Sequence, residues 1–501
     1  MKTKIVLFLM AILPFLSINA TAGIGENTCF ISVSDYGAKG DGIRLNTKSI
    51  NSAIAAAVAK GGGTVYFPAG NYVTGSIHLQ SNINLYIDKG AVIIAAPYDD
   101  STGYDLPEPE KNKFQDFGHS HFHNSLIWGE KLHDVGIIGG GKIWGKALVR
   151  SMTPTLKEPN KAISLLSCSN VVLRDITIEH GGWFALLATG VDNMTIDNLL
   201  IDTDRDGMDI DCCQNVRISN CTVNSPQDDG ICLKSSFALG YARSTKNVTI
   251  SNCFVSGYLE GSLLDGTYQP DQRPAPIGRI KMGTESNGGF QNISISNCVF
   301  DHCRGLALES SDGALLEDVV INNITMRDVT NSPLFVRLNR RMRGPDSLQI
   351  GACRRILISN VNVYNARVDS TASIISGIPD HEIEDLELSN IHIYYKGGGT
   401  KKMAETQVPE FEINYPEPYR FGVIPAYGFF IRHVKNLILK DIHVSFQQPD
   451  ERSPFILDDV KTAHLQGIRA KRKESVPVFV LKEVTGLKII DCEGVKDSSK
   501  E

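Results

Sequence analysis

A short motif recurs along most of this chain and restricts the folds that the chain can adopt. Each copy runs for about nine residues, in which Asn, Asp or Arg is followed by alternating apolar residues, then Ser, Asn or Asp, and then a second apolar pair. Copies begin at Asn170, Asn193, Asn215, Asn247, Asn292, Asp318, Arg355, Asp385 and Asn436. The spacing between neighbouring copies is nearly constant where no insertion intervenes, as from Asn170 to Asn193 and from Asn193 to Asn215. Because one such turn cannot bury its apolar side alone, we predict an all-β, single-stranded parallel β-helix whose turns share one core and pair Asn side chains at the corners.

The N-terminus carries an export signal. Residues 1–22 combine a basic start, a short apolar run and the small residues Ala20-Thr-Ala22, which is typical of a cleaved secretory signal peptide. The apolar run is too short for a comfortable membrane span, and no later stretch is apolar for long enough. We therefore expect an exported protein, periplasmic or extracellular, without a membrane span.

The rest of the chain is expected to be one domain. Asn46 can cap a helix over residues 47–59, and a helix with one apolar face can shield the open end of a solenoid. No Pro/Ser-rich linker or charge block follows it. We predict a β-helix over residues 23–495 with this N-terminal capping helix, and a short tail over residues 496–501.

Charge and cysteine content exclude some partners and leave others open. A net charge of −6 gives no reason to expect nucleic acid or an anionic membrane as a partner. Eleven cysteines in an exported protein suggest disulfides, but the number is odd. Cys221, Cys253 and Cys298 share one repeat position, so we expect a stacked column of mostly unpaired thiols, with one bridge as the alternative.

Acidic residues gather in the middle of the repeat. Asp206 and Asp228 stand at the same distance after the Asn that opens their own repeat, and Asp229 follows directly. If the repeats are successive coils, Asp206 and Asp228 occupy the same register about 4.8 Å apart. Carboxylates that crowd together raise one another's pKa and destabilise the fold, so such a cluster indicates chemistry.

The same position in two other repeats predicts a longer column on the surface. Trp183 occupies it in the repeat that opens at Asn170, and Glu260 occupies it in the repeat that opens at Asn247. An aromatic platform beside several carboxylates fits glycoside hydrolysis, in which one carboxyl group stays protonated and another activates water. A calcium site or a solvated acidic turn is the alternative that spacing leaves open.

Three insertions break the period, at residues 262–277, 340–353 and 396–426. Insertions in a solenoid become loops on one face, where they often build the walls of a binding site. The last one is rich in Tyr, Pro and Glu, which suggests a carbohydrate cleft. The alternative is that these loops only cover neighbouring coils.

Two motifs in this region resemble those of glycoside hydrolase family 28, the polygalacturonase family. Asp204-Arg-Asp-Gly-Met-Asp209 is similar to the family's Asn-Thr-Asp-Gly-x-Asp motif, and Gln227-Asp-Asp-Gly-Ile-Cys-Leu-Lys234 is similar to its Gly-Asp-Asp-Cys-Ile motif. The N-terminal Asp-Tyr-Gly-Ala-Lys-Gly-Asp-Gly and Gly-Gly-Gly-Thr-Val-Tyr-Phe-Pro-Ala-Gly blocks also resemble this family, together with other pectin-degrading β-helix enzymes. The similarity spans roughly residues 30–444.

This resemblance implies a fold and a mechanism. The fold is a right-handed, pectin lyase-like β-helix, and the reaction is inverting hydrolysis without a cofactor or metal. Asp228 would be the general acid, while Asp206 and Asp229 would activate the water, and inversion needs roughly 6.5–9.5 Å between acid and base. Asp209, in the first motif, would bind substrate.

Two departures from the family pattern concern the substrate. The family's Gly-His-Gly is replaced by Ile277-Gly-Arg-Ile-Lys-Met282, and its carboxylate-binding Arg-Ile-Lys is replaced by Leu306-Ala-Leu-Glu-Ser310. Glu309 would repel a uronate at that subsite. Polygalacturonan is therefore not the only substrate to consider, and rhamnogalacturonan, cleaved by relatives in the same family, is the alternative.

Other basic residues could supply the missing clamp for a substrate carboxylate. Arg279 and Lys281 alternate onto one side of a strand, and the full set of candidates is Lys234, Arg279, Lys281, Arg337 and the run Arg340-Arg-Met-Arg343. A solvated surface charge is the competing interpretation for each. His119, His121 and His123 have the spacing of a metal site on a strand face, but we favour a polar loop at the edge of the cleft.

The sequence thus predicts a secreted, monomeric glycoside hydrolase that acts on a galacturonate-containing pectic substrate, with exo action as a hypothesis drawn from the long insertions. The competing classes are a β-helix pectate lyase, which needs Ca²⁺ and a basic residue, and a non-catalytic carbohydrate-binding or adhesin β-helix.

Overall fold

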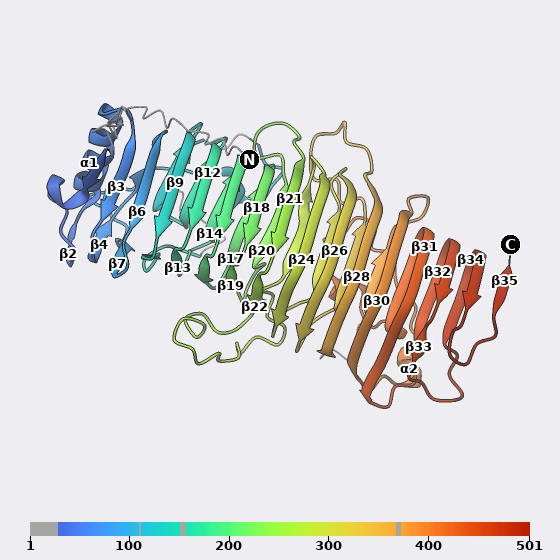
Figure 1. Cartoon of the computed structure of the whole chain (residues 1–501). Helices are drawn as coiled ribbons and strands as arrows, with labels where there is room; N and C mark the ends of the chain where they lie inside the picture. Colours follow the sequence, from blue (N-terminus) through green and yellow to red (C-terminus); the bar gives the residue numbers. More distant parts are fainter. Residues whose placement is uncertain (1–28, 110–111, 151–156, 367–371, 501) are drawn as a thin grey trace, which may run out of the picture.

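The chain folds into one elongated solenoid of parallel strands (Figure 1). The computed structural model describes residues 29–109, 112–150, 157–366 and 372–500. The expected signal peptide lies outside these residues. Among the described strand pairs all are parallel except β34 (Phe479–Ile490) with β35 (Ser498–Lys500), which confirms the predicted parallel β-helix.

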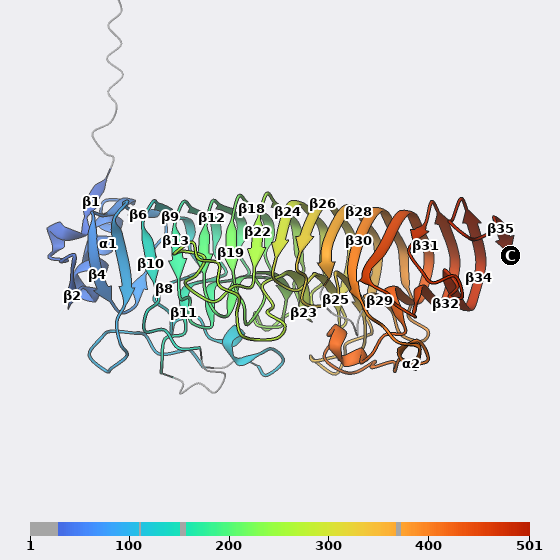
Figure 2. The ribbon, with the colours of Figure 1, turned by 90° about the horizontal axis from the view of Figure 1, so that it is seen from below.

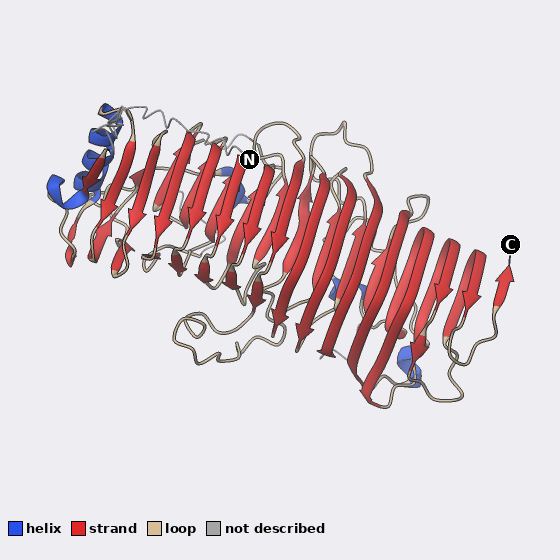
Figure 3. Cartoon of the chain, viewed as in Figure 1, coloured by secondary structure: helices blue, strands red, loops and turns tan. Residues whose placement is uncertain are grey.

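The strand pairings join successive coils into three sheets, and Figure 3 shows that strands make up most of the solenoid. The first sheet contains β5 (Ile77–His78), β8 (Ile127–Glu130), β11 (Lys161–Leu166), β14 (Phe184–Thr189), β17 (Asp206–Asp211), β20 (Ile231–Ser235), β23 (Ile280–Ser286), β25 (Leu306–Ser310), β27 (Leu334–Leu338) and β29 (Ser373–Ser376). The second contains β1 (Phe30–Ser32), β3 (Gly63–Phe67), β6 (Ile83–Ile87), β9 (His133–Gly139), β12 (Ser169–Arg174), β15 (Asp192–Asp197), β18 (Gln214–Ser219) and β21 (Thr245–Ser251). The third contains β2 (Asp41–Leu45), β4 (Gly70–Thr74), β7 (Ala91–Ala95), β10 (Lys142–Trp144), β13 (Thr177–Glu179), β16 (Leu200–Asp202), β19 (Thr222–Asn224) and β22 (Phe254–Ser256).

Longer strands in the later coils bend from one sheet into the next. They are β24 (Phe290–Asp301), β26 (Leu315–Arg327), β28 (Ala352–Ala366), β30 (Ile383–Gly397), β31 (Ala426–Gln448) and β32 (Ser453–Gln466), with β33 (Arg469–Ala470) beside them. β24 pairs with both β21 and β22, so it continues the second and third sheets in one strand. β31 likewise pairs with β29, β30 and β33.

A helix closes the N-terminal end, as predicted. α1 (Thr47–Ala59) buries Ile50, Ala53, Ile54 and Ala57 against the first coil. The predicted side-chain cap from Asn46 is wrong, because this amide bonds to the backbone of Lys39 and Arg44 instead of to the helix. The other helices are short: α2 (Lys401–Ala404) and the 3₁₀ turns η1 (Val33–Tyr36), η2 (Phe117–Ser120) and η3 (Pro418–Phe421).

Asn ladders form the corners between the sheets. Asn193 donates to Asn170 at 3.2 Å, Asn247 donates to Asn215 at 2.9 Å, and Asn292 donates to Asn247 at 2.8 Å. These residues have positive φ, a left-handed conformation that Asn tolerates better than most residues. The repeat motif therefore begins with Asn because each coil turns sharply there.

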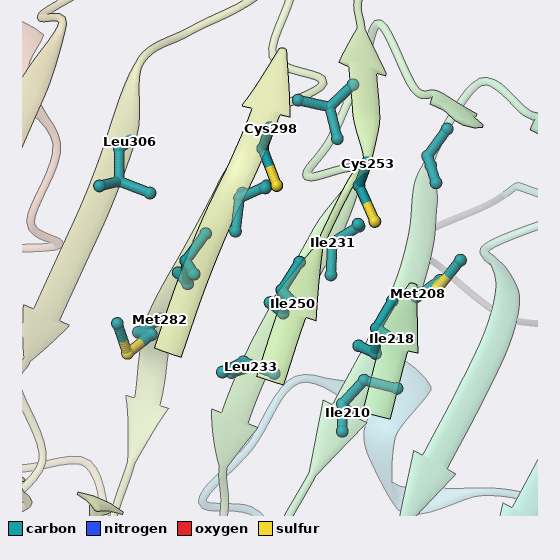
Figure 4. Packing of buried hydrophobic residues seen from close by; sticks show 14 of the residues in the cluster. Met208, Ile210, Ile218, Ile231, Leu233, Ile250, Cys253, Met282, Cys298 and Leu306 are labelled. Carbon is teal, nitrogen blue, oxygen red and sulfur yellow. The ribbon is translucent and has the colours of Figure 1, made fainter. Parts of the chain in front are cut away.

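Inward-facing side chains make one continuous core along the axis (Figure 4). Met208, Ile210, Ile231 and Leu233 illustrate it, since alternate residues of neighbouring strands stack in register. All eleven cysteines of the chain are free thiols, and Cys221, Cys253 and Cys298 form the predicted buried column. None of the helices in the described part of the chain is both long and apolar enough to cross a membrane.

Candidate active site

The predicted register of the acidic residues is wrong by one position. In the second sheet neighbouring coils keep the spacing of the Asn motif, since Met194 pairs with Val216, but in the first sheet Met208 pairs with Ile231. Asp202 pairs with Asn224 and Met208 pairs with Ile231, so the later coil has one more residue between its paired positions. Asp229 rather than Asp228 therefore lies opposite Asp206. The Gly207 N–H accordingly donates to the Asp229 carbonyl at 3.0 Å.

Asp206 and Asp228 nevertheless meet through Arg205. One guanidinium nitrogen, Arg205 Nη2, lies 3.4 Å from Asp206 Oδ2 and also donates to Asp228 Oδ2. The guanidinium stacks on the Trp183 ring, 4.6 Å from its centroid. Trp183 is only 2% exposed, so it supports Arg205 and does not form the predicted open platform. Arg205 was missed in the sequence, although it occupies the Thr position of the family motif.

The surroundings of Asp206 raise the pKa of its carboxyl group, which makes the ionised form a stronger base. Burial raises the pKa of this carboxyl well above its usual range, and the negative charges of Asp228 and Asp209 add to the effect. The positive charges of Arg205 and Lys234 oppose the shift in pKa without cancelling it. Asp228 is the most open of the three predicted catalytic carboxylates, with 27% of its side chain exposed.

Asp229 is held ionised instead. Arg279 Nε donates to Asp229 Oδ1 at 2.8 Å, and Lys281 Nζ lies 3.3 Å from Asp229 Oδ2. Burial alone would raise the pKa of Asp229, but the charges of Lys281, Arg279 and Lys234 outweigh it and lower the pKa. Arg279 and Lys281, two of the residues predicted to bind a substrate carboxylate, are thus 2% exposed and neutralise a carboxylate of the protein.

A second buried network lies beside this one. Asp209 accepts a hydrogen bond from His119 at 2.7 Å and lies 3.5 Å from Lys234 Nζ, which also contacts Glu285 at 3.0 Å. Burial alone would lower the pKa of Lys234, but the charges of Asp209 and Glu285 outweigh it and raise the pKa well above its ordinary value. Asp209 and Lys234 therefore adjoin the catalytic carboxylates, but both are buried.

The insertion at residues 396–426 covers the site from outside. Glu417 pairs with Arg279 and with Arg304 at 3.1 Å, and the Tyr415 hydroxyl accepts a hydrogen bond from Lys281 at 3.3 Å. Figure 2 shows the long connections gathered along one side of the solenoid, next to β8, β11, β23, β25 and β29 of the first sheet. The insertion therefore packs against the face of the first sheet that carries the acidic residues, and the carbohydrate cleft remains a prediction.

Glu309 does not face outward as expected. Its side chain is fully buried, it accepts a hydrogen bond from Thr284 at 2.8 Å, and it lies 3.6 Å from Lys281. Burial raises the pKa of Glu309 to about 7, against the charges of Lys281 and Arg279. Glu309 thus belongs to the internal charge network, and it cannot repel a substrate directly in this conformation.

Arg337 is not part of the site in this structure. It is fully buried one coil beyond Glu309, and its guanidinium donates to the carbonyls of Gly377, Glu410 and Phe411. Burial lowers the pKa of Arg337 to about 9. Its contacts hold the insertion at residues 396–426 against the coils.

The other two insertions also reach the site region. Arg273 donates to Asp204 at 2.7 Å, which ties the insertion at residues 262–277 to the first acidic motif. Arg343, from the insertion at residues 340–353, pairs with Glu285. Glu260 is part of this rim, paired with Arg150 and lying 3.3 Å from His180.

The three histidines do not share one strand face. His119 lies in η2 and meets Asp209, His121 contacts the Glu108 carbonyl, and His123 contacts Glu130 at 3.0 Å. This separation supports the polar-loop interpretation, and only His119 reaches the site. Within the described ranges, no group of His, Cys, Asp or Glu side chains has the arrangement of a metal site.

Family models match two parts of the chain. Residues 30–103 match a model described as rhamnogalacturonase A/epimerase, pectate lyase-like, and residues 121–266 match a right-handed β-helix region. The second match gives the handedness of the coils.

Curated relatives include pectin-degrading enzymes. A probable polygalacturonase of Vitis vinifera is 24% identical over 72% of this chain and 74% of its own length. An exo-poly-α-D-galacturonosidase of Dickeya chrysanthemi is 26% identical over 60% of this chain and 51% of its own length.

Solved structures share the fold. A Yersinia enterocolitica family 28 exopolygalacturonase covers 93% of this chain and 79% of its own, with a TM-score of 0.61 and 18% identity. The Streptococcus pneumoniae surface adhesin PfbA covers 91% and 100%, with a TM-score of 0.51 and 16% identity. The fold is therefore found both in hydrolases and in an adhesin, so the site must decide between these classes.

Proposed function

We propose that this right-handed β-helix protein, which is similar to polygalacturonases and to a family 28 exopolygalacturonase, is an exported hydrolase of galacturonate-containing pectic glycans. The observation that carries this proposal is the buried Asp206, whose pKa is raised, beside the more open Asp228. An adhesin has no need of two carboxylates that share a site, because their repulsion destabilises the fold.

Acid–base catalysis needs one protonated and one ionised carboxyl group. Asp206 and Asp228 share the Arg205 guanidinium, and the negative charge of Asp228 adds to the raised pKa of Asp206. We assign the acid role to Asp228, which is open to the leaving oxygen, and the base role to Asp206. Asp229 is a weak base because its two oxygens face Arg279 and Lys281, and it therefore orients the water.

Arg205 must move for this chemistry to occur. Its Nη2 contacts both carboxylates at once, which leaves no room between them for water and a sugar. An inverting enzyme separates its acid and base by roughly 6.5–9.5 Å. Displacement of Arg205 by the substrate would open that space and release a guanidinium for a substrate carboxylate.

Rhamnogalacturonan is the second candidate substrate. Arg279 and Lys281 are already paired with Asp229, Glu309 and Glu417, so they do not offer a free clamp for successive uronates. A chain in which galacturonate alternates with a neutral sugar demands fewer such clamps. The walls built by the three insertions support exo action, with release of short products from a chain end.

The test is a panel of polygalacturonate, rhamnogalacturonan and their oligosaccharides, with products identified by mass and by the configuration of the new anomeric centre. We expect new reducing ends of inverted configuration and short products from the first minutes. An unsaturated product that absorbs in the ultraviolet and disappears with a chelator would indicate a lyase and overturn the proposal. Binding without turnover of any of these glycans would indicate the adhesin class.

A further inference from the structure

The connection between β7 and β8 carries His119 onto the first sheet. His119 lies in η2 and is only 2% exposed, and its Nε2 lies 2.7 Å from Asp209 Oδ2. An ionised carboxylate can only accept a hydrogen bond, so Nε2 carries the proton of this contact. The ring also packs edge-on against Phe184, with 4.9 Å between the ring centroids. One polar contact and one apolar contact thus fix the imidazole.

The same connection approaches the first sheet closely at Gly118. A Cβ atom at this position would lie 2.7 Å from Phe184 Cε2 and 3.1 Å from Trp183 Cε2, so glycine is what allows the approach. The segment is also held from outside, because Arg343 Nη1 donates to Asp116 at 2.8 Å. These contacts hold the connection in one place, and with it the imidazole.

Asp209 has few other contacts that could fix its side chain. Its Oδ1 is buried and has no hydrogen-bond partner among the residues that the structure describes. Lys234 Nζ lies 3.5 Å from Asp209 Oδ2, but it lies closer to Glu285, at 3.0 Å. Asp211 and Glu285 are also close enough to interact electrostatically with His119. Within the described part of the chain, loss of His119 would leave Asp209 with Lys234 as its one ionic partner, and that partner is shared.

Asp209 acts on Asp206 through its charge. The two carboxylates lie three residues apart on β17. The pKa of Asp206 is raised first by burial and then by the negative charges of Asp228 and Asp209. A higher pKa makes the ionised Asp206 a stronger base. Because Asp209 itself is fully buried, its contribution in this structure is its charge and not a contact with substrate.

We infer that His119 is a positioning residue of the hydrolytic reaction, which holds the Asp209 carboxylate beside the base Asp206 through the hydrogen bond from Nε2. The role of Asp206 as the base rests on the proposed function. The contact between His119 and Asp209 and the close approach at Gly118 do not depend on it.

The test compares His119→Leu and His119→Gln on the glycan that the parent protein hydrolyses. Leucine removes the donor, whereas the amide of glutamine can donate from near the position of Nε2 without carrying a charge. His119→Leu should lower kcat about tenfold, a part of what a general base contributes. KM should not change, because His119 is buried away from the substrate. His119→Gln should restore most of kcat.

The pH profile gives a second measurement on the same variants. In His119→Leu, the buried Asp209 either turns towards Lys234 or takes up a proton, and both changes weaken the effect of its negative charge on Asp206. The pKa of Asp206 should then fall, and the acidic limb of kcat/KM should move to lower pH. Asp209→Asn should move the limb in the same direction. His119→Leu added to Asp209→Asn should lower kcat no further, since the two residues act through one contact.

The matched control is His133→Leu. His133 makes the same kind of contact, with Asp134 at 2.8 Å, but it lies on the second sheet and 56% of its side chain is exposed. This variant should leave kcat, KM and the acidic limb at the parent values.

The outcomes separate this inference from the proposed function. A parent protein that hydrolyses none of the pectic glycans would overturn both. With an active parent, an unchanged kcat in His119→Leu would overturn the inference alone, as would additive losses in the double variant or an acidic limb that moves to higher pH. A fall in kcat that comes with a lower thermal midpoint and is not restored in His119→Gln would also overturn it, because that pattern indicates a structural role only.

Discussion

Arg279 Nε donates to Asp229 Oδ1 at 2.8 Å from the next coil, and both residues are buried. Removal of one partner from a buried ion pair leaves the other charge unpaired, which costs about 3–5 kcal/mol. Arg279→Met should lower the free energy of unfolding by about 3 kcal/mol, the lower end of that range, because Asp229 keeps its contact with Lys281 and Glu417 keeps its contact with Arg304. Denaturant unfolding measures this change.

The matched control for this prediction is Arg44→Met. Arg44 pairs with Asp41 at 3.5 Å on the surface, where its side chain is 69% exposed. Exposed pairs contribute about 0–1 kcal/mol. An equal decrease in the free energy of unfolding of the two variants would show that the Arg279–Asp229 pair is not a buried structural contact.

Removal of the positive charge at Arg205 should change the pH dependence of activity. Arg205 lowers the pKa of Asp206, so Arg205→Met should raise that pKa further. If Asp206 acts as the base, it must be ionised, and the acidic limb of the kcat/KM profile should move to higher pH. Arg243→Met, which breaks a contact with Asp192 outside the site, should leave the limb in place. A shift to lower pH in Arg205→Met would contradict the base role.

Because of Glu309, the free energy of unfolding should fall as the pH rises. Its folded pKa of about 7 exceeds the usual value near 4.5, so its stabilising effect is complete below the unfolded pKa and is lost as pH rises through 7. The loss amounts to about 3 kcal/mol at most. Glu309→Gln should flatten this part of the curve of unfolding free energy against pH. The same slope in both proteins would refute the assignment.

The thiols should all be titratable. Each of the eleven cysteines is free, so denatured protein should react with eleven equivalents of a thiol reagent. Reductant should not change the thermal midpoint, because it has no bridge to break. A count of nine, together with a midpoint that falls in reductant, would reveal a disulfide.

Much of the fold could be predicted because each coil repeats the same corner and the same alternation. Asn193 and Asn215 mark equivalent corners, and the apolar residues after them stack as expected. The register of Asp206 could not be predicted from these corners. One additional residue in the turn before β20 shifts the first sheet relative to the second, and the Asn motif lies only in the second.

The residues that surround the carboxylates were harder to predict from the sequence. His119 meets Asp209, and Arg279 meets Glu417, although each pair is far apart along the chain. The segments that contain His119 and Glu417 are outside the periodic pattern, so spacing carries no information about where they pack. Arg279 and Lys281 were expected on one side of a strand, and both contact Asp229, but the contact of Arg279 with Glu417 depends on how the insertion at residues 396–426 folds over them.

We propose that Asp206 and Asp228 together catalyse the hydrolysis of a pectic glycan. The most direct test is the initial rate of reducing-sugar release from polygalacturonate and rhamnogalacturonan by the parent protein, Asp228→Asn and the exposed control Asp100→Asn. We expect Asp228→Asn to lower kcat by at least about 100-fold with little change in the thermal midpoint, since a general acid contributes that much, and Asp100→Asn to match the parent. Reducing-sugar release that continues at the parent rate in Asp228→Asn would contradict the account.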